Sequence, residues 1–219
     1  AVQRRKLVEL LTTNSRAQKL ELPDAPRHLS SSSKGLVALS GEFAIAFTPE
    51  GTERKRWNVS PAASSAHLLS ATKSEGAVLY IAYPSGSLEG REQLPLARKA
   101  AAAPVVFKRT PSSRITALQR GPAGTLAIGY EDGTLGLWEA RSGNRLMHDR
   151  LHGPVRHILL DQGQLFGVTE LGDERGWDLT ALAMSRCELL RDIWKHVPVV
   201  WQNGVATPAL PPAEHPCSP

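Results

Sequence analysis

The chain has 219 residues, of which 41% are hydrophobic and 21% charged, and its formal net charge is +5. This length permits one large domain or two small ones with a sizeable core, and no apolar run is long enough to cross a bilayer. The modest positive charge permits an acidic partner but does not favour nucleic acid, because no matching motif accompanies it. Two cysteines, Cys187 and Cys217, are too few for a disulfide framework. They predict two free thiols in a reducing cytoplasm.

The first 34 residues allow two readings. Residues 6–11 (KLVELL) could begin a short helix, or residues 6–13 and 17–22 could be two strands joined by Asn14-Ser15. The second reading is preferred, because it places a turn at a distance that recurs further along the chain. The serine run at 30–34 predicts a turn or loop. Because the chain begins with Ala1 rather than Met, it can be a fragment or a processed product.

Glycine-tipped turns between apolar runs recur along the chain and predict β-hairpins. The clearest is residues 130–138 (YEDGTLGLW), in which Asp132-Gly133 supplies the positive φ that a tight turn needs. Looser copies occupy residues 47–57, 82–92 and 168–179. The turn glycines are Gly51, Gly86, Gly133 and Gly172, which are 35, 47 and 39 residues apart. One hairpin in about every 40 residues is typical of a β-propeller.

The middle of the chain holds the best repeated unit. Residues 115–139 alternate strand and turn, and they align by eye with residues 155–179. The stretch 98–110 contains an alanine-rich patch, and it predicts a loop that lengthens the 47-residue step, since loops accept insertions at small entropic cost.

The C-terminal part departs from this pattern. Residues 182–194 place apolar side chains at helical spacing and predict a short amphipathic helix. Asn203-Gly204 between apolar runs predicts a further hairpin. The expected organisation is therefore propeller blades over 1–180, a helix and hairpin packed on them over 181–207, and a proline-rich tail over 208–219. Trp194 and Trp201 are expected to make that packing.

Residues 114–179 resemble two blades of the WD-repeat β-propeller family. Asp132, Gly133 and Trp138 match the family's turn and strand in one blade, as do Gly172-Asp173 and Trp177-Asp178 in the next. The family often begins a blade with Gly-His, whereas this chain has Leu151-His152-Gly153, so the usual His–Asp hydrogen bond is not implied here. The resemblance implies an all-β propeller of about five to six blades, or part of a seven-bladed one. The tryptophans Trp57, Trp138 and Trp177 are expected to pack between blades.

No pattern of residues predicts catalysis, a cofactor or a metal site. The chain lacks a phosphate-binding loop, a Cys-x-x-Cys pair and a Gly-x-Ser-x-Gly elbow. His148, His152 and His157 lie close in sequence with Asp149 and Asp161 nearby, but their spacing matches no ligand pattern. Blade-edge and loop positions explain them without a metal.

The sequence therefore predicts a non-catalytic, cytoplasmic scaffold that binds a protein or peptide partner on one face of the propeller. The residues expected to contact the partner lie in loops beside the best blades; they are Arg114, Tyr130, Glu131, Arg156 and Glu170. The remaining part of the same propeller is a second possible partner. The alternative is a regulatory or sensor portion of a larger bacterial protease, kinase or signalling ATPase system, which the resemblance also implies.

Overall fold

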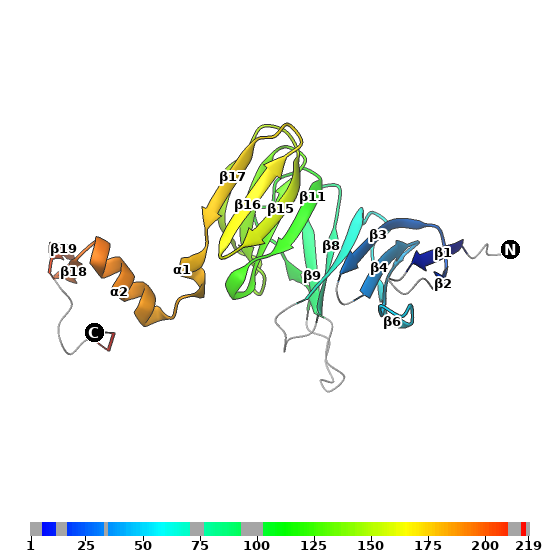
Figure 1. Cartoon of the computed structure of the whole chain (residues 1–219), viewed down its shortest axis with the longest axis horizontal. Coiled ribbons are helices and arrows are strands. Elements are labelled where there is room, and N and C mark those ends of the chain that lie inside the picture. The colour runs from blue at the N-terminus through cyan, green and yellow to red at the C-terminus, as the bar shows by residue number, and fades with distance from the viewer. Residues whose placement is uncertain are drawn as a thin grey trace.

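Short antiparallel strands, most of them ended by glycine-containing turns, build almost the whole molecule. The computed structural model describes residues 6–11, 17–32, 35–70, 77–92, 103–209 and 216–217. Figure 1 shows the sheets standing side by side along the long axis, from β1–β2 at one end to β17. The fold is an all-β propeller arrangement of four blades, with a smaller sheet before them and a helix–hairpin unit after them.

Each blade is one antiparallel sheet whose strands follow one another in the sequence. Blade 1 consists of β3 (Pro26–Ser32), β4 (Gly35–Ser40), β5 (Phe43–Phe47) and β6 (Glu53–Asn58). Blade 2 consists of β7 (Ser65–Ser70), β8 (Ala77–Ala82), β9 (Leu88–Glu92) and β10 (Val105–Val106). Blade 3 consists of β11 (Ile115–Arg120), β12 (Thr125–Tyr130), β13 (Thr134–Glu139) and β14 (Arg145–Arg150), with a short 3₁₀ turn, η1 (Pro122–Gly124), after β11. Blade 4 consists of β15 (Val155–Asp161), β16 (Gln164–Thr169) and β17 (Glu174–Asp178).

The second strands of blades 1 and 3 are buried on both faces, because neighbouring strands cover each face. In β12, Leu126 and Ile128 face blade 2, whereas Ala127 faces blade 4, as the two-residue period of a strand requires. Gly129 also faces blade 4, where a Cβ atom would lie 2.5 Å from Val155 Cγ1. The blades can therefore approach this closely only because small residues alternate with large ones.

Three apolar clusters fill the spaces between the blades, and each contains one tryptophan. Trp57 lies between blades 1 and 2 with Leu79 and Ile81. Trp138 lies between blades 2 and 3, where it is fully buried, and its Nε1–H donates to Lys108 O at 2.9 Å. Trp177 lies between blades 3 and 4.

Two N-terminal strands, β1 (Lys6–Leu11) and β2 (Ala17–Leu22), pair as an antiparallel sheet. Leu20 and Leu22 are buried against β4 and β5 of blade 1. The strand reading of this region is confirmed, while the turn predicted at Asn14-Ser15 lies outside the described residues. At the other end of the series, Leu159 and Phe166 are cross-strand partners on the outward face of blade 4, with 59% and 38% of their surface exposed.

In blade 1, the predicted assignment of Gly51 and Trp57 to particular strands is wrong. The turn with Gly51 connects β5 to β6, and Trp57 therefore stands on the fourth strand rather than the third. The turn equivalent to Asp132-Gly133 contains Gly41, which also has a positive φ. The prediction was wrong because blade 1 has two glycine turns in succession, and only the second is followed by a tryptophan.

Two segments predicted to be loops are strands. Ser30–Ser32 belong to β3, where their backbone pairs with β4, so a serine run did not prevent strand pairing. Val105–Val106 form β10, the short fourth strand of blade 2.

The chain after blade 4 forms a separate group of elements: α1 (Thr180–Ala183), α2 (Arg186–His196), β18 (Val199–Gln202) and β19 (Val205–Pro208). The predicted helix and hairpin are both present, and Asn203 and Gly204 have the positive φ values of the expected turn. Figure 1 shows α2 and this hairpin extending away from the blades. Trp201, expected to pack against the blades, is 77% exposed instead. No helix among the described residues is long and apolar enough to span a membrane.

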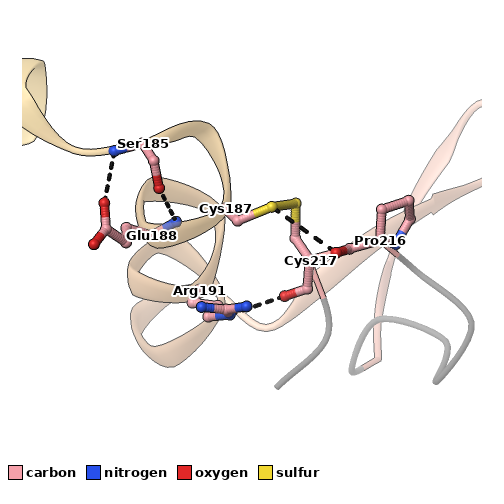
Figure 2. Close-up of a disulfide and its surroundings, with 6 residues drawn as sticks. All are labelled: Ser185, Cys187, Glu188, Arg191, Pro216 and Cys217. Carbon is pink, nitrogen blue, oxygen red and sulfur yellow. Dashed lines mark hydrogen bonds between the residues drawn. A yellow bond between two sulfur atoms is a disulfide. The ribbon is translucent and has the colours of Figure 1, made fainter.

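The prediction of two free thiols is wrong. Cys187 in α2 and Cys217 in the tail form a disulfide (Figure 2). The two residues are 30 positions apart, and sequence spacing alone gives no sign that the tail folds back onto the helix. The expectation of a cytoplasmic location rested on reduced cysteines, and the disulfide removes that support.

Candidate functional site

One end of blades 3 and 4 brings together four of the residues predicted to bind a partner. The loops that enter each blade and the turns between second and third strands lie at the same end, because the strands alternate in direction. We call residues 111–114, 131–133, 151–156 and 170–173 the turn rim. Backbone hydrogen bonds join its loops and turns in matching positions: Glu131 N–H donates to Arg114 O, and Glu170 N–H to Pro154 O, both at 2.9 Å.

Two Arg–Glu ion pairs lie on this rim, one in each blade. Arg114 Nη2 lies 2.8 Å from Glu131 Oε1, and its Nε donates to Oε2 at 3.3 Å. Arg156 Nη2 and Nε donate to Glu170 Oε2 at 2.6 and 3.0 Å. The four side chains are between 42% and 53% exposed. Each blade therefore presents an Arg–Glu pair whose glutamate holds the same turn position, while Arg114 precedes β11 and Arg156 lies on β15.

The ion pairs influence each other electrostatically. Hydrogen bonding from Arg114 and its charge hold the pKa of Glu131 below its usual value, and Arg156 of the next blade adds to the effect. The same contact raises the pKa of Arg114. Both partners stay charged at neutral pH, and the two Arg–Glu pairs together carry no net charge.

A third contact on the rim joins His152 to Asp173. Asp173 Oδ2 accepts from His152 N–H at 2.9 Å and lies 3.1 Å from His152 Nδ1. These hydrogen bonds lower the pKa of Asp173, with the backbone bond as the largest cause. The altered order Leu151-His152-Gly153 therefore keeps a His–Asp contact, but the His152 side chain is 93% exposed and the contact lies at the surface. In blade 3, Asp132 precedes the turn glycine instead of following it, and closes its own turn by accepting from Thr134 N–H.

Tyr130 is not part of this surface, which corrects its prediction as a partner-binding residue. It is fully buried between blades 2 and 3, with its ring centroid 6.1 Å from that of Trp138. Burial also raises the pKa of its phenol. Its position next to a turn suggested exposure, but it is the last residue of β12 and alternates to the face that blade 2 covers.

A groove in blade 2, at the same end of the blades, was not predicted from the sequence. It measures about 550 Å³ and is lined by Ser60, Ala62, Tyr83, Pro84, Ser85, Ser87 and Glu89. Pro84 occupies the turn position that Glu131 and Glu170 hold in the next two blades, so the ion pair is replaced by a hydroxyl-rich hollow. The Pro84-Ser85-Gly86 turn was its only sequence signal, since turns rich in serine are common without any ligand.

No metal centre emerges in the part of the chain that the structure describes, where no three His, Cys, Asp or Glu side chains converge. His148 stands on β14, His152 on the rim and His157 on β15, so their closeness in sequence does not bring them together around one point.

Comparison with known proteins shows the fold. No protein-family model matches the chain, and no curated protein matches its sequence. A chain of the mitotic checkpoint complex superposes with a TM-score of 0.61 at 15% identity, over 80% of this chain and 56% of that one. Hsv2 of Kluyveromyces lactis gives 0.56 at 11% identity, over 87% and 63%. BamB of Moraxella catarrhalis gives 0.56 at 15% identity, over 82% and 59%. The chain thus spans little more than half the length of these structures, and at such identities the likeness concerns the fold alone.

Proposed function

We propose that the chain is a non-catalytic β-propeller interaction module, and that the turn rim of blades 3 and 4 binds a protein or peptide partner. The observation that carries the proposal is a half-exposed Arg–Glu pair on each of two adjacent blades, with the two glutamates in equivalent turn positions. A segment with alternating charges would meet complementary groups at two successive points.

The rim rests on a rigid support. All the residues of β12, and all of β13 except Glu139, are buried, and they hold the turn that carries Glu131. Binding groups held by packed strands lose little conformational freedom when a partner arrives.

The ion pairs also have capacity to bind. Each guanidinium has five N–H donors. Arg114 and Arg156 each use two of their nitrogens to contact glutamate, and the other N–H groups remain available to a partner. Exposed pairs contribute only about 0–1 kcal/mol to stability. A partner can therefore compete for these groups without disturbing the blades.

A charge swap tests the proposal. We would select peptides from a displayed random library on the wild-type chain and measure their affinity by calorimetry. In the double variant Arg114→Glu/Glu131→Arg the pair is retained but reversed, so the fold should survive while binding weakens at least tenfold. The matched control reverses Arg56 and Glu53, a pair on the outer strand of blade 1 with both side chains 40% exposed. Equal affinity for the wild type and the rim variant, or an equal loss in the control, would refute the rim as the site.

A further inference from the structure

The C-terminal unit, residues 180–217, has almost no core among its described residues, 180–209 and 216–217. No residue of α2 is buried. Six of the unit's large apolar side chains are exposed: Leu182, Met184, Ile193, Val197, Trp201 and Val205. Its strands form an isolated two-stranded hairpin, and such a hairpin is marginally stable at best in water. Something other than burial must therefore hold these elements together.

The Cys187–Cys217 disulfide supplies that connection. It closes a loop that contains most of α2 and the whole β18–β19 hairpin. Figure 2 shows Cys217 beside α2, where Arg191 Nε donates to Cys217 O at 3.0 Å. A crosslink of this kind stabilises the folded segment, because it lowers the conformational entropy of the unfolded one. For a unit without a core, this contribution decides whether the folded form is populated.

The two sulfurs differ in their surroundings. Cys217 is only 3% exposed, whereas Cys187 is half-buried near the start of α2. The capping box of Ser185 and Glu188 fixes that start: Ser185 Oγ accepts from Glu188 N–H, and Glu188 Oε2 accepts from Ser185 N–H. Cys187 thus sits in the first helical turn, where the helix dipole stabilises negative charge on sulfur. An external thiolate reaches Cys187 more easily than Cys217.

We propose that the Cys187–Cys217 disulfide is a thiol-reducible lock that controls the order of the C-terminal unit. A thiolate of a dithiol reductant attacks Cys187 Sγ, the S–S bond breaks, and Cys217 leaves as a thiolate and takes up a proton. The second thiol of the reductant then attacks the mixed disulfide and releases Cys187, which is protonated in turn. The reductant becomes a disulfide, so two electrons and two protons pass to the protein. The freed tail leaves α2, and the hairpin loses its closure. This inference does not depend on the partner-binding proposal.

A redox titration with a structural readout tests the lock on the whole chain. The protein is equilibrated in mixtures of reduced and oxidised glutathione, its thiols are alkylated, and the reduced fraction is measured by mass spectrometry. Parallel samples are digested with trypsin, which can cut α2 at Arg191 and Lys195. We expect reversible reduction within the range of these mixtures and at least tenfold faster cleavage in α2, with cleavage at Arg145 of β14 unchanged.

The variant Cys187→Ser/Cys217→Ser should be cut in α2 as fast as the reduced wild type, whatever the glutathione mixture. If this variant fails to fold, the titration of the wild-type protein still tests the proposal by itself. A disulfide that stays oxidised in the most reducing mixture would overturn the proposal. Reduction that leaves cleavage in α2 unchanged would overturn it as well.

Discussion

The interface between blades 2 and 3 and the C-terminal unit represent two ways of holding a polypeptide in place. Between the blades, Trp138, Tyr130 and Tyr80 are among the largest fully buried side chains in the described residues, and Phe107 packs edge-on to Tyr80 at 6.0 Å. In the C-terminal unit, Trp201 is 77% exposed and a disulfide closes the segment. Broad sheet faces can bury enough apolar surface to be stable, whereas a short helix and hairpin cannot, and a crosslink takes the place of a core.

The largest expected difference between the two regions comes from their tryptophans. Trp138→Ala removes a fully buried indole and its hydrogen bond to Lys108 O. It should lower the free energy of unfolding by about 3–5 kcal/mol. Trp201→Ala is the matched control and should change it by less than about 0.5 kcal/mol, because the side chain is exposed. Urea denaturation measures both, and similar losses would contradict the assignment of the core.

Two turn glycines sharpen the comparison within the blades. Gly133 and Gly172 occupy equivalent turns with φ of +86° and +82°. A Cβ at Gly133 would lie 2.2 Å from Leu151 O, while one at Gly172 has nothing within 4 Å. Gly172→Ala should cost about 1 kcal/mol for its backbone conformation alone, and Gly133→Ala roughly 2–4 kcal/mol since strain and clash combine. Thermal unfolding of the two variants should rank them in this order. Equal losses would contradict this ranking and would show that the loop with Leu151 moves away from the added Cβ at little cost.

Acid should weaken the contact between the inner strands of blades 1 and 2. His28 and His67 lie with ring centroids 4.9 Å apart, and desolvation, with a smaller contribution from His28, lowers the pKa of His67 to about 4. Burial also lowers the pKa of His28.

In the unfolded chain these imidazoles bind protons at higher pH than in the folded chain. The stability that depends on keeping these histidines neutral is therefore fully present above about pH 6.5 and is lost as the pH falls toward 4. Protonation of His67 should lower the free energy of unfolding by about 2 kcal/mol between pH 7 and pH 5. Urea denaturation at a series of pH values should show that the free energy of unfolding depends less on pH in His67→Phe than in the wild type. An unaltered pH slope in that variant would contradict the assignment.

The smallest expected effect lies in the C-terminal unit. Ser185→Ala removes the side-chain acceptor of the capping box and should destabilise α2 by about 1 kcal/mol. Because α2 buries no residue, the unfolding midpoint of the blades should not move. Circular dichroism should show a small loss of helix with unchanged blade unfolding. A shift of the main transition would show that α2 contributes to the blades after all.

Much of the blade structure was predictable because its information is local. Asp132-Gly133 forms the turn that its sequence predicts, and the alternation in β12 and β13 assigns each side chain to a face. Gly51 and Trp57 were misplaced by one strand because blade 1 offers two glycine turns. The expectation was five to six blades or part of a seven-bladed propeller. The described residues form four blades with β1–β2 beside them, and the Asn203-Gly204 hairpin belongs to the C-terminal unit.

The candidate site was only partly predictable. Arg114, Glu131 and Glu170 lie in loops or turns as expected, whereas Arg156 lies on β15. The pairing of their charges depends on how neighbouring loops meet, and their role in binding a partner stays a prediction. Tyr130 was misjudged because the burial of a strand's last residue depends on the neighbouring blade, here blade 2. The disulfide depends on where the tail travels over 30 residues, and nothing near Cys187 or Cys217 in the sequence records that path.

Amide hydrogen exchange, resolved along the chain, compares the two regions most directly. The oxidised protein and the same protein reduced by thiol would be followed under identical conditions. Strands β8, β12 and β13 should exchange slowly and at the same rate in both, whereas α2 and β18–β19 should exchange at least tenfold faster after reduction. Faster exchange throughout the blades, or unchanged exchange in α2 and β18–β19, would contradict the separation of a packed propeller from a crosslinked C-terminal unit.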